Sequence, residues 1–276
     1  MFIMLVVISL ITSNLFGQGA YVSVNAGYGI GMGTQSLESS HTYTSTSTSE
    51  IENFKKSDAS FGKGLNFGCT FGYMINKNIG AEIGFSYLLG DKIKIKDDSY
   101  TYGYTNSHSS TDFTESSKMF RINPSLIIAS GLDKLNLYAK FGLVIGIGSV
   151  TDKSNNNSDG SIVEQTVFYN GGMAIGLSSG IGFMFKLSDK MSFYTELNMV
   201  NLSYAPTKGK ITVYTYNGVD KLPTLTTKQK ETDFVDSYTT DSNNPIPDSQ
   251  PDKALKSKAP FGSFGINIGL KLSLSK

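Results

Sequence analysis

Residues 135–147 read LNLYAKFGLVIGI, and apolar residues recur at every second position of this stretch. The alternate apolar residues are Leu135, Leu137, Ala139, Phe141, Leu143, Ile145 and Ile147. The residues set against them include Asn136, Tyr138, Lys140, Gly142 and Gly146. Successive side chains of a β-strand point to opposite faces, so this period of two predicts a strand with one apolar face and one face of polar residues and glycine.

The same alternation recurs along the chain and predicts eight strands in all. The other seven lie at 20–33, 65–73, 79–89, 120–128, 173–186, 193–199 and 264–274. Most of these runs extend over roughly ten residues, which is enough to cross a bilayer when the strand is tilted. Eight is an even number and the smallest that closes a bacterial barrel.

The predicted connections alternate between short and long. Short turns join strands at 75–78, 131–133 and 188–190. The long connections, which are rich in Ser, Thr, Asn and Asp, cover 34–60, 91–117, 150–170 and 207–260. Short periplasmic turns and long extracellular loops are typical of outer-membrane barrels. The sequence therefore predicts an all-β, closed, antiparallel, eight-stranded transmembrane up-and-down β-barrel.

A soluble β-sandwich is the alternative for a chain of alternating strands. Its solvent face would carry Lys, Glu and Thr more often than Gly, whereas here glycine, 29 residues in all, recurs opposite the apolar positions. A small barrel leaves little interior volume and needs bending points, so glycine on the inner face favours the barrel.

The chain begins with a short apolar run, MFIMLVVISLI at 1–11, followed by small and polar residues. This run is too short to span a bilayer as a helix and is typical of a signal-peptide core. We therefore expect a signal peptide at 1–19, cleaved after Gly17 or Gly19, and a barrel domain at 20–276. No Lys or Arg precedes the apolar run, so a retained interfacial anchor is the alternative.

Composition excludes several function classes. The formal net charge is +1, which offers no basic surface for nucleic acid. A single cysteine, Cys69, excludes an internal disulfide and a Cys-based zinc site. We expect no cofactor, no metal ion and no nucleic-acid partner.

Several segments resemble the eight-stranded outer-membrane β-barrel family that includes OmpX-like and OmpA-transmembrane-like proteins, in the Bacteroidota style. They are GAEIGFSY at 80–87, RINP at 121–124, LYAKFG at 137–142 and GINIGLKL at 265–272. The resemblance implies a location in the bacterial outer membrane, contact with its lipid, and recognition by the barrel-assembly machinery. The assembly signal that it implies is formed by Asn267, Gly269, Leu272 and Leu274, with Leu where aromatic residues are usual.

Six charged residues fall on the predicted inner face. They are Glu82, Arg121, Lys140, Lys186, Glu196 and Lys271. A lone charge in a narrow lumen would be costly, so we hypothesise a plug in which the two carboxylates pair with the lysines. A gated ion path through the same cluster is the alternative.

Function is expected in the long loops, which meet an external partner in a structural or adhesive, non-enzymatic role. A narrow ion or small-solute channel is one alternative. A lipid A-modifying enzyme is another and draws attention to His41 and His108, although both lie in Ser/Thr-rich loop sequence. No residue is predicted to be catalytic.

Overall fold

A computed structural model describes residues 19–33, 35–102 and 106–274, and its chain is almost entirely β-structure. The signal peptide predicted at 1–19 therefore lies outside the described residues, except for Gly19. The helical elements among the described residues are the short η1 (Leu222–Thr224) and α2 (Thr227–Lys230). No helix in this part of the chain is long and apolar enough to cross a membrane.

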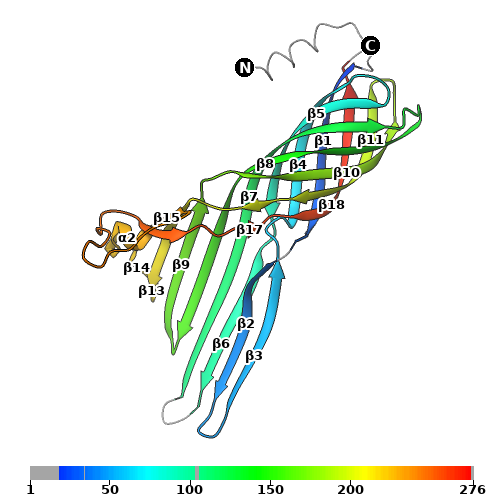
Figure 1. The fold of residues 1–276 in the computed structure, drawn as a ribbon. Coiled ribbons are helices and arrows are strands. Elements are labelled where there is room, and N and C mark those ends of the chain that lie inside the picture. The colour runs from blue at the N-terminus through cyan, green and yellow to red at the C-terminus, as the bar shows by residue number, and fades with distance from the viewer. Residues whose placement is uncertain (1–18, 34, 103–105, 275–276) are drawn as a thin grey trace.

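Eight strands are linked by hydrogen-bonded pairs in a ring, which forms the upper part of Figure 1. In ring order they are β1 (Gly19–Gly31), β4 (Gly64–Met74), β5 (Ile79–Gly90), β7 (Ser107–Ala129), β8 (Leu135–Ser158), β10 (Ala174–Lys186), β11 (Met191–Asn201) and β18 (Ser263–Ser273). Every pair around the ring is antiparallel, and β18 pairs with β1. These eight strands correspond to the eight segments that alternate in the sequence.

Short turns join neighbouring ring strands at one end, where side chains hold the backbone. Between β4 and β5, Asn76 Oδ1 accepts hydrogen bonds from the backbone N–H groups of Asn78 and Ile79, both at 2.8 Å. Between β10 and β11, Ser188 Oγ accepts one from the N–H of Met191 at 3.1 Å. Asn and Ser stabilise tight turns in this way. This end of the ring is called the short-turn end below.

The two faces of the ring strands differ as the sequence pattern predicts. On β8, Leu137, Phe141 and Leu143 expose 54, 61 and 48% of their surface on the outside, while Tyr138 and Val144 are buried inside. On β18, Ile266 and Ile268 are exposed by more than half, while Asn267 is 7% exposed. Soluble proteins rarely expose a contiguous apolar surface of such extent.

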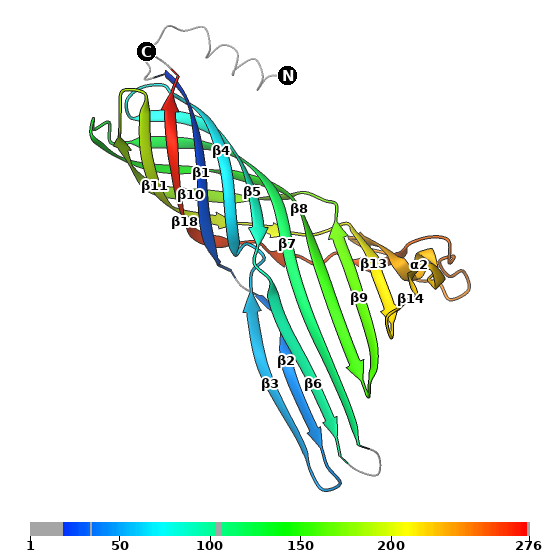
Figure 2. The same ribbon diagram turned by 180° about the vertical axis from the view of Figure 1, so that it is seen from behind.

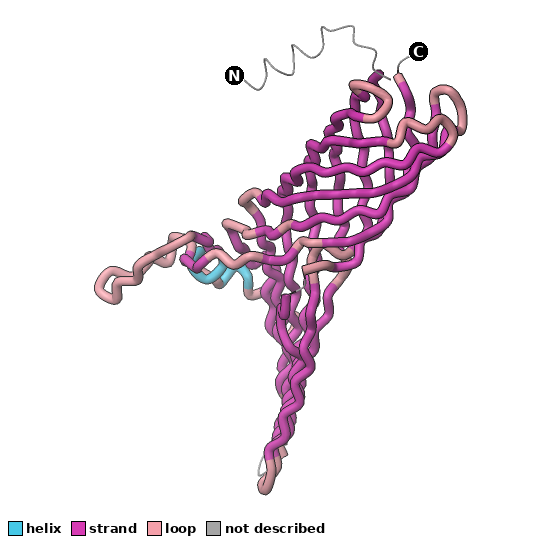
Figure 3. Tube along the Cα trace, turned by 45° about the vertical axis from the view of Figure 1, so that its right-hand side comes forward, coloured by secondary structure: helices cyan, strands magenta, loops and turns pink. Residues whose placement is uncertain are grey.

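A second part of the sheet projects beyond the other end of the ring (Figure 1). It consists of the N-terminal half of β7 and the C-terminal half of β8 together with strands outside the ring. These are β2 (Gln35–Ser45), β3 (Glu50–Ala59), β6 (Ile93–Thr101), β9 (Ser161–Asn170), β13 (Lys208–Tyr216), β14 (Val219–Asp220), β15 (Glu231–Val235) and β16 (Asp252–Leu255). We call this part the projecting sheet; Figure 3 shows it from the side as a thin layer.

The projecting strands lie in the segments that the sequence predicts as long loops. Most of their pairs are antiparallel, but β2 pairs with β6, and β15 with β16, in parallel. Tight turns close two hairpins: Asp159 and Gly160 have positive φ between β8 and β9, and Asn217 and Gly218 between β13 and β14. Asp-Gly and Asn-Gly favour this conformation. The segment 150–158, part of the long connection predicted at 150–170, is therefore strand.

Two very short strands lie at the end of the ring opposite the short turns, which is called the loop end below. They are β12 (Ser203–Tyr204) and β17 (Ala259–Pro260), which pair with each other. In the sequence, β12 comes just after the end of β11, and β17 comes just before the start of β18. The pair therefore lies at the mouth of the ring.

Candidate functional site

Three charged side chains meet inside the ring. Lys140 on β8 places its Nζ 2.8 Å from an Oε of Glu196 on β11 and 3.3 Å from an Oε of Glu82 on β5. The side chains of Glu196 and Glu82 are only 2% and 8% exposed. One ammonium group therefore bridges two buried carboxylates that come from different sides of the ring.

Neutral donors complete the surroundings of both carboxylates. Glu82 accepts hydrogen bonds from Tyr21 Oη at 2.9 Å and Ser125 Oγ at 3.2 Å. Glu196 accepts hydrogen bonds from Tyr138 Oη at 3.0 Å and Asn267 Nδ2 at 3.4 Å. Buried charge is tolerated when it is both paired and hydrogen-bonded. The arrangement connects β5, β8 and β11 across the ring.

Inward-facing glycines make room for these groups. A Cβ added at Gly180 would lie 3.0 Å from Glu196 Cδ and 3.2 Å from Lys140 Cε. A Cβ at Gly72 would lie 2.1 Å from Cζ of Tyr21. The glycine-rich inner face thus allows large tyrosine and charged side chains to cross a narrow interior.

The other predicted charges lie apart from this trio. Lys271 places its Nζ 3.6 Å from the ring centre of Tyr21, within reach of a cation–π contact. Lys186, predicted to belong to the cluster, instead has a 48% exposed side chain and pairs with Asp189 at 2.9 Å. Lys186 ends β10, so its long side chain reaches the adjacent turn rather than the centre of the ring.

Arg121 on β7 faces inward and is 3% exposed. Its Nε and Nη2 have no hydrogen-bond partner in the described part of the chain. Arg121 and the Lys140 trio line the same cavity, which has a volume of about 80 Å³. Polar residues form much of the wall, among them Asn25, Asn66, Asn123, Ser178 and Asn198.

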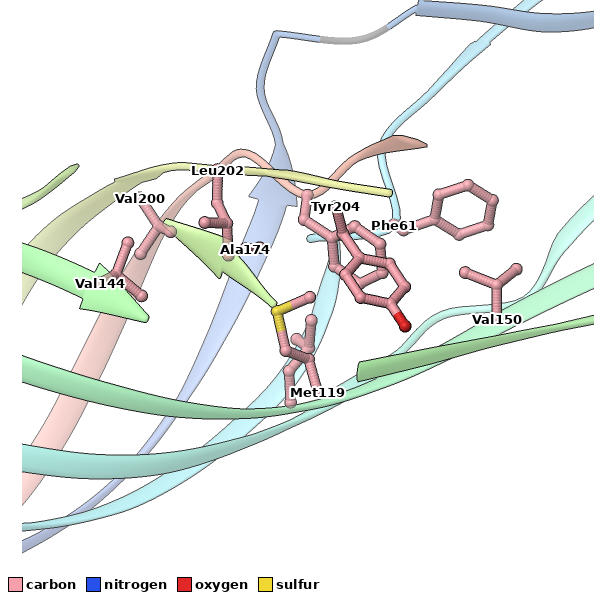
Figure 4. Packing of buried hydrophobic residues seen from close by; sticks show 10 residues of the cluster. Phe61, Met119, Val144, Val150, Ala174, Val200, Leu202 and Tyr204 are labelled. Atoms are coloured by element: carbon pink, nitrogen blue, oxygen red, sulfur yellow. The ribbon is translucent and has the colours of Figure 1, made fainter. Parts of the chain in front are cut away.

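Apolar clusters lie on both sides of this polar middle layer. Toward the loop end is a cluster of ten buried residues, the upper plug (Figure 4). Its members are Phe61, Leu88, Met119, Val144, Val150, Ala174, Val200, Leu202, Tyr204 and Phe261. Toward the short-turn end is the lower plug, formed by Tyr21, Met74, Ile127, Ala129, Tyr138 and Tyr194.

Tyr204 anchors the upper plug. It is fully buried, and the carbonyl oxygens of Gly148 and Gly171 lie 2.6 and 2.7 Å from its Oη, so that they share its single O–H donor. Its ring meets that of Phe261 edge-on, with centroids 5.6 Å apart. The β12–β17 pair thus carries two aromatic rings into the interior.

Sequence reasoning missed both plugs. The sequence did contain one sign of the upper plug. Leu88, Met119 and Val144 are large apolar residues at inward-facing positions, where the rest of each strand has polar residues or glycine. Tyr204 and Phe261 lie outside the alternating segments and gave no such signal.

The residues of the predicted assembly signal divide between the two faces of β18. Leu272 and Leu274 are 49% and 59% exposed on the outside. Asn267 bonds Glu196 inside, and a Cβ added at Gly269 would lie 2.6 Å from Cζ of Tyr194. Asn267 and Gly269 therefore also serve packing in the interior, and their role in assembly remains a prediction.

The two histidines lie in the projecting sheet, His41 on β2 and His108 near the start of β7. His41 stacks on Phe54, with centroids 4.6 Å apart, and lies 3.4 Å from Asp97. His108 stacks on Tyr100 at 4.2 Å and lies 3.8 Å from Asp98. Each histidine thus packs against a neighbouring aromatic ring. Among the described residues, no group of His, Cys, Asp and Glu is arranged to hold a metal ion.

Comparisons with known proteins find a matching family model and similar solved structures. The model of a family described as outer membrane protein beta-barrel domain matches residues 8–220. Neisserial surface protein A (NspA) is 12% identical, with a TM-score of 0.38 and coverage of 93% of this chain and 97% of that structure. CarO2 of Acinetobacter baumannii is 13% identical, with a TM-score of 0.31 and coverage of 92% and 98%. No curated protein matches the chain.

The family match begins at residue 8, ahead of β1, and ends with β14, so it covers every ring strand except β18. The exposed apolar outer face and the polar interior of the ring are the features that such a membrane domain requires. The chain therefore belongs to the outer membrane protein beta-barrel domain family, and it is a protein of the bacterial outer membrane.

Proposed function

We propose that the ring is a closed eight-stranded transmembrane barrel that anchors the projecting sheet, and that this sheet contacts an external partner in a structural or adhesive role. The observation that carries the proposal is the outer edge of the sheet, strand β3, which lies at the margin in both Figure 1 and Figure 2. Among the described strands, β3 pairs only with β2.

The chemistry of β3 suits a contact surface. An edge strand presents unpaired backbone N–H and C=O groups to which another strand can add. Ile51 and Phe54 are 55% and 66% exposed on this edge. Lys55 and Lys56 accompany them, and lysines on an edge limit indiscriminate pairing. The strand thus combines apolar contact area with charges that select a partner.

The interior of the ring supports a structural role over conduction. The upper plug and the lower plug fill the lumen on either side of the Lys140 trio, and the cavity between them is only about 80 Å³. Purified protein in planar bilayers should therefore give no steady ohmic current. Such a current would favour the channel alternative.

The test of the contact surface compares cells that display two forms of the protein. Ile51→Lys/Phe54→Lys removes the apolar area of β3, and the expected result is loss of adhesion to a partner-bearing surface while the amount of folded barrel is unchanged. Val24→Ala, on the outer wall of the ring, is the matched control and should leave adhesion intact. Equal adhesion by the double variant and the wild type would contradict the proposal.

A further inference from the structure

The interior of the ring holds one positive charge that no carboxylate balances. Glu82 and Glu196 supply two negative charges, and Lys140 pairs with both of them. Lys271 supplies a second positive charge. It lies above the ring of Tyr21, and the hydroxyl of Tyr21 donates a hydrogen bond to Glu82. The two lysines balance the two carboxylates, so Arg121 adds a third positive charge in excess. None of the ion pairs in the described part of the chain includes Arg121.

The surroundings of Arg121 make this imbalance costly. The residue is 3% exposed, and two of its three guanidinium nitrogens lack a hydrogen-bond partner. The upper plug begins with Met119, two residues before it on the same face of β7. A buried charge without a counter-charge is strongly destabilising, and water supplies hydrogen bonds but no counter-charge.

The cavity next to Arg121 offers a place for a counter-ion. A volume of about 80 Å³ corresponds to about five waters, which is room for a small inorganic anion. Asn25 and Asn66 also line it, and the Oδ1 atom of each has no hydrogen-bond partner among the residues that the structure describes. A rotation of either carboxamide presents its N–H groups to the cavity instead.

We propose that the lumen contains a binding site for one small inorganic anion, held by the Arg121 guanidinium and the amides of Asn25 and Asn66. The site is independent of the surface role proposed above, because it lies between the two plugs and involves no residue of the projecting sheet. Its occupant completes the charge balance of the interior and stabilises the folded barrel.

The test measures unfolding in detergent as bromide replaces gluconate, an organic anion too large for the cavity, at constant ionic strength. A ligand that binds only the folded state at ten times its dissociation constant raises the folding equilibrium constant about elevenfold. The wild type should show such a saturable rise. Arg121→Gln should show none, whereas Lys77→Gln, which removes a positive charge from an exposed turn, should respond like the wild type.

Crystals grown with bromide provide a readout that does not depend on the folding of a variant. An anomalous peak in the cavity within contact distance of the guanidinium supports the site. If Arg121→Gln fails to fold, this peak and a preserved bromide response in Arg121→Lys decide the question. A wild type that is indifferent to bromide, or a cavity filled by water alone at saturating bromide, would overturn the proposal.

Discussion

Removing the ammonium group of Lys140 is the sharpest perturbation of the interior. Lys140→Met keeps much of the side-chain volume but leaves Glu82 and Glu196 without the cation that lies 3.3 and 2.8 Å from them. Breaking a buried ion pair by removing one partner costs about 3–5 kcal/mol. The tyrosine, serine and asparagine donors still satisfy both carboxylates, and the Lys140 side chain is 26% exposed. We therefore expect the lower end, about 3 kcal/mol less free energy of unfolding.

The assay is urea unfolding in lipid vesicles, with the folded fraction read from the migration of unheated protein on a gel. The chain contains no tryptophan, so intrinsic tryptophan fluorescence cannot follow the transition. Lys77→Met, on the exposed turn between β4 and β5, should change the free energy of unfolding by less than about 0.5 kcal/mol. Adding Glu82→Gln and Glu196→Gln to Lys140→Met should recover part of the loss, because it removes the two carboxylates that the Lys140 ammonium no longer balances. A Lys140→Met protein as stable as the Lys77→Met control would mean that the Lys140 ammonium does not stabilise the interior.

Three further predictions concern the wall, the interior and the projecting sheet. Phe141→Arg, on the 61% exposed outer face of β8, should lower the free energy of unfolding in vesicles by about 2–4 kcal/mol if it lies near the bilayer midplane, and by much less near an interface. Gly269→Ala should cost about 1–3 kcal/mol, since its Cβ would lie 2.6 Å from Tyr194 Cζ, whereas Gly84→Ala, with its closest contact at 3.4 Å, should be tolerated; equal urea midpoints would contradict the packing. Burial opposes ionisation of Asp98, but hydrogen bonds from Ser110 and Lys96 hold its pKa below the ordinary value of 3.8. The stabilisation of β6 by this carboxylate is thus present above pH 3.8 and lost as the pH falls through the lower folded pKa, so amide exchange in β6 should accelerate there in the wild type but not in Asp98→Asn.

The ring was predictable from the sequence because each of its strands has two chemically different faces. The alternation around Phe141 and Ile268 marks the outer face directly, and it also assigns Glu82, Lys140 and Glu196 to the interior. The pattern gives the face of a residue but not the reach of its side chain. Lys186 has the inward phase, yet it lies at the end of β10 and pairs with Asp189 in the turn.

The sequence alternates at 92–96 and 211–216, which predicts projecting hairpins there, and β6 and β13 contain these segments except for Lys92. The strands β2 and β3 were not predictable in the same way. Residues such as Thr42, Thr44 and Ser45 on β2 contrast little with their neighbours, so no period stands out. They form strands because the N-terminal half of β7 and the C-terminal half of β8 extend beyond the ring and start a sheet there, which is a tertiary effect. The upper plug was missed for a related reason, since Tyr204 and Phe261 come together only when β12 pairs with β17.

The central claim is that the apolar outer face of the ring touches lipid while the projecting sheet lies in water. Phe141 on β8 and Phe54 on β3 are 61% and 66% exposed, so they differ in surroundings and not in exposure. Because the chain has no tryptophan, a single substitution, Phe141→Trp or Phe54→Trp, gives a fluorophore that reports on its own site. In vesicles of brominated lipid, the account predicts strong quenching at position 141 and none at 54, with the reverse for aqueous iodide. Equal quenching of both positions by iodide, with no effect of the brominated lipid, would contradict it.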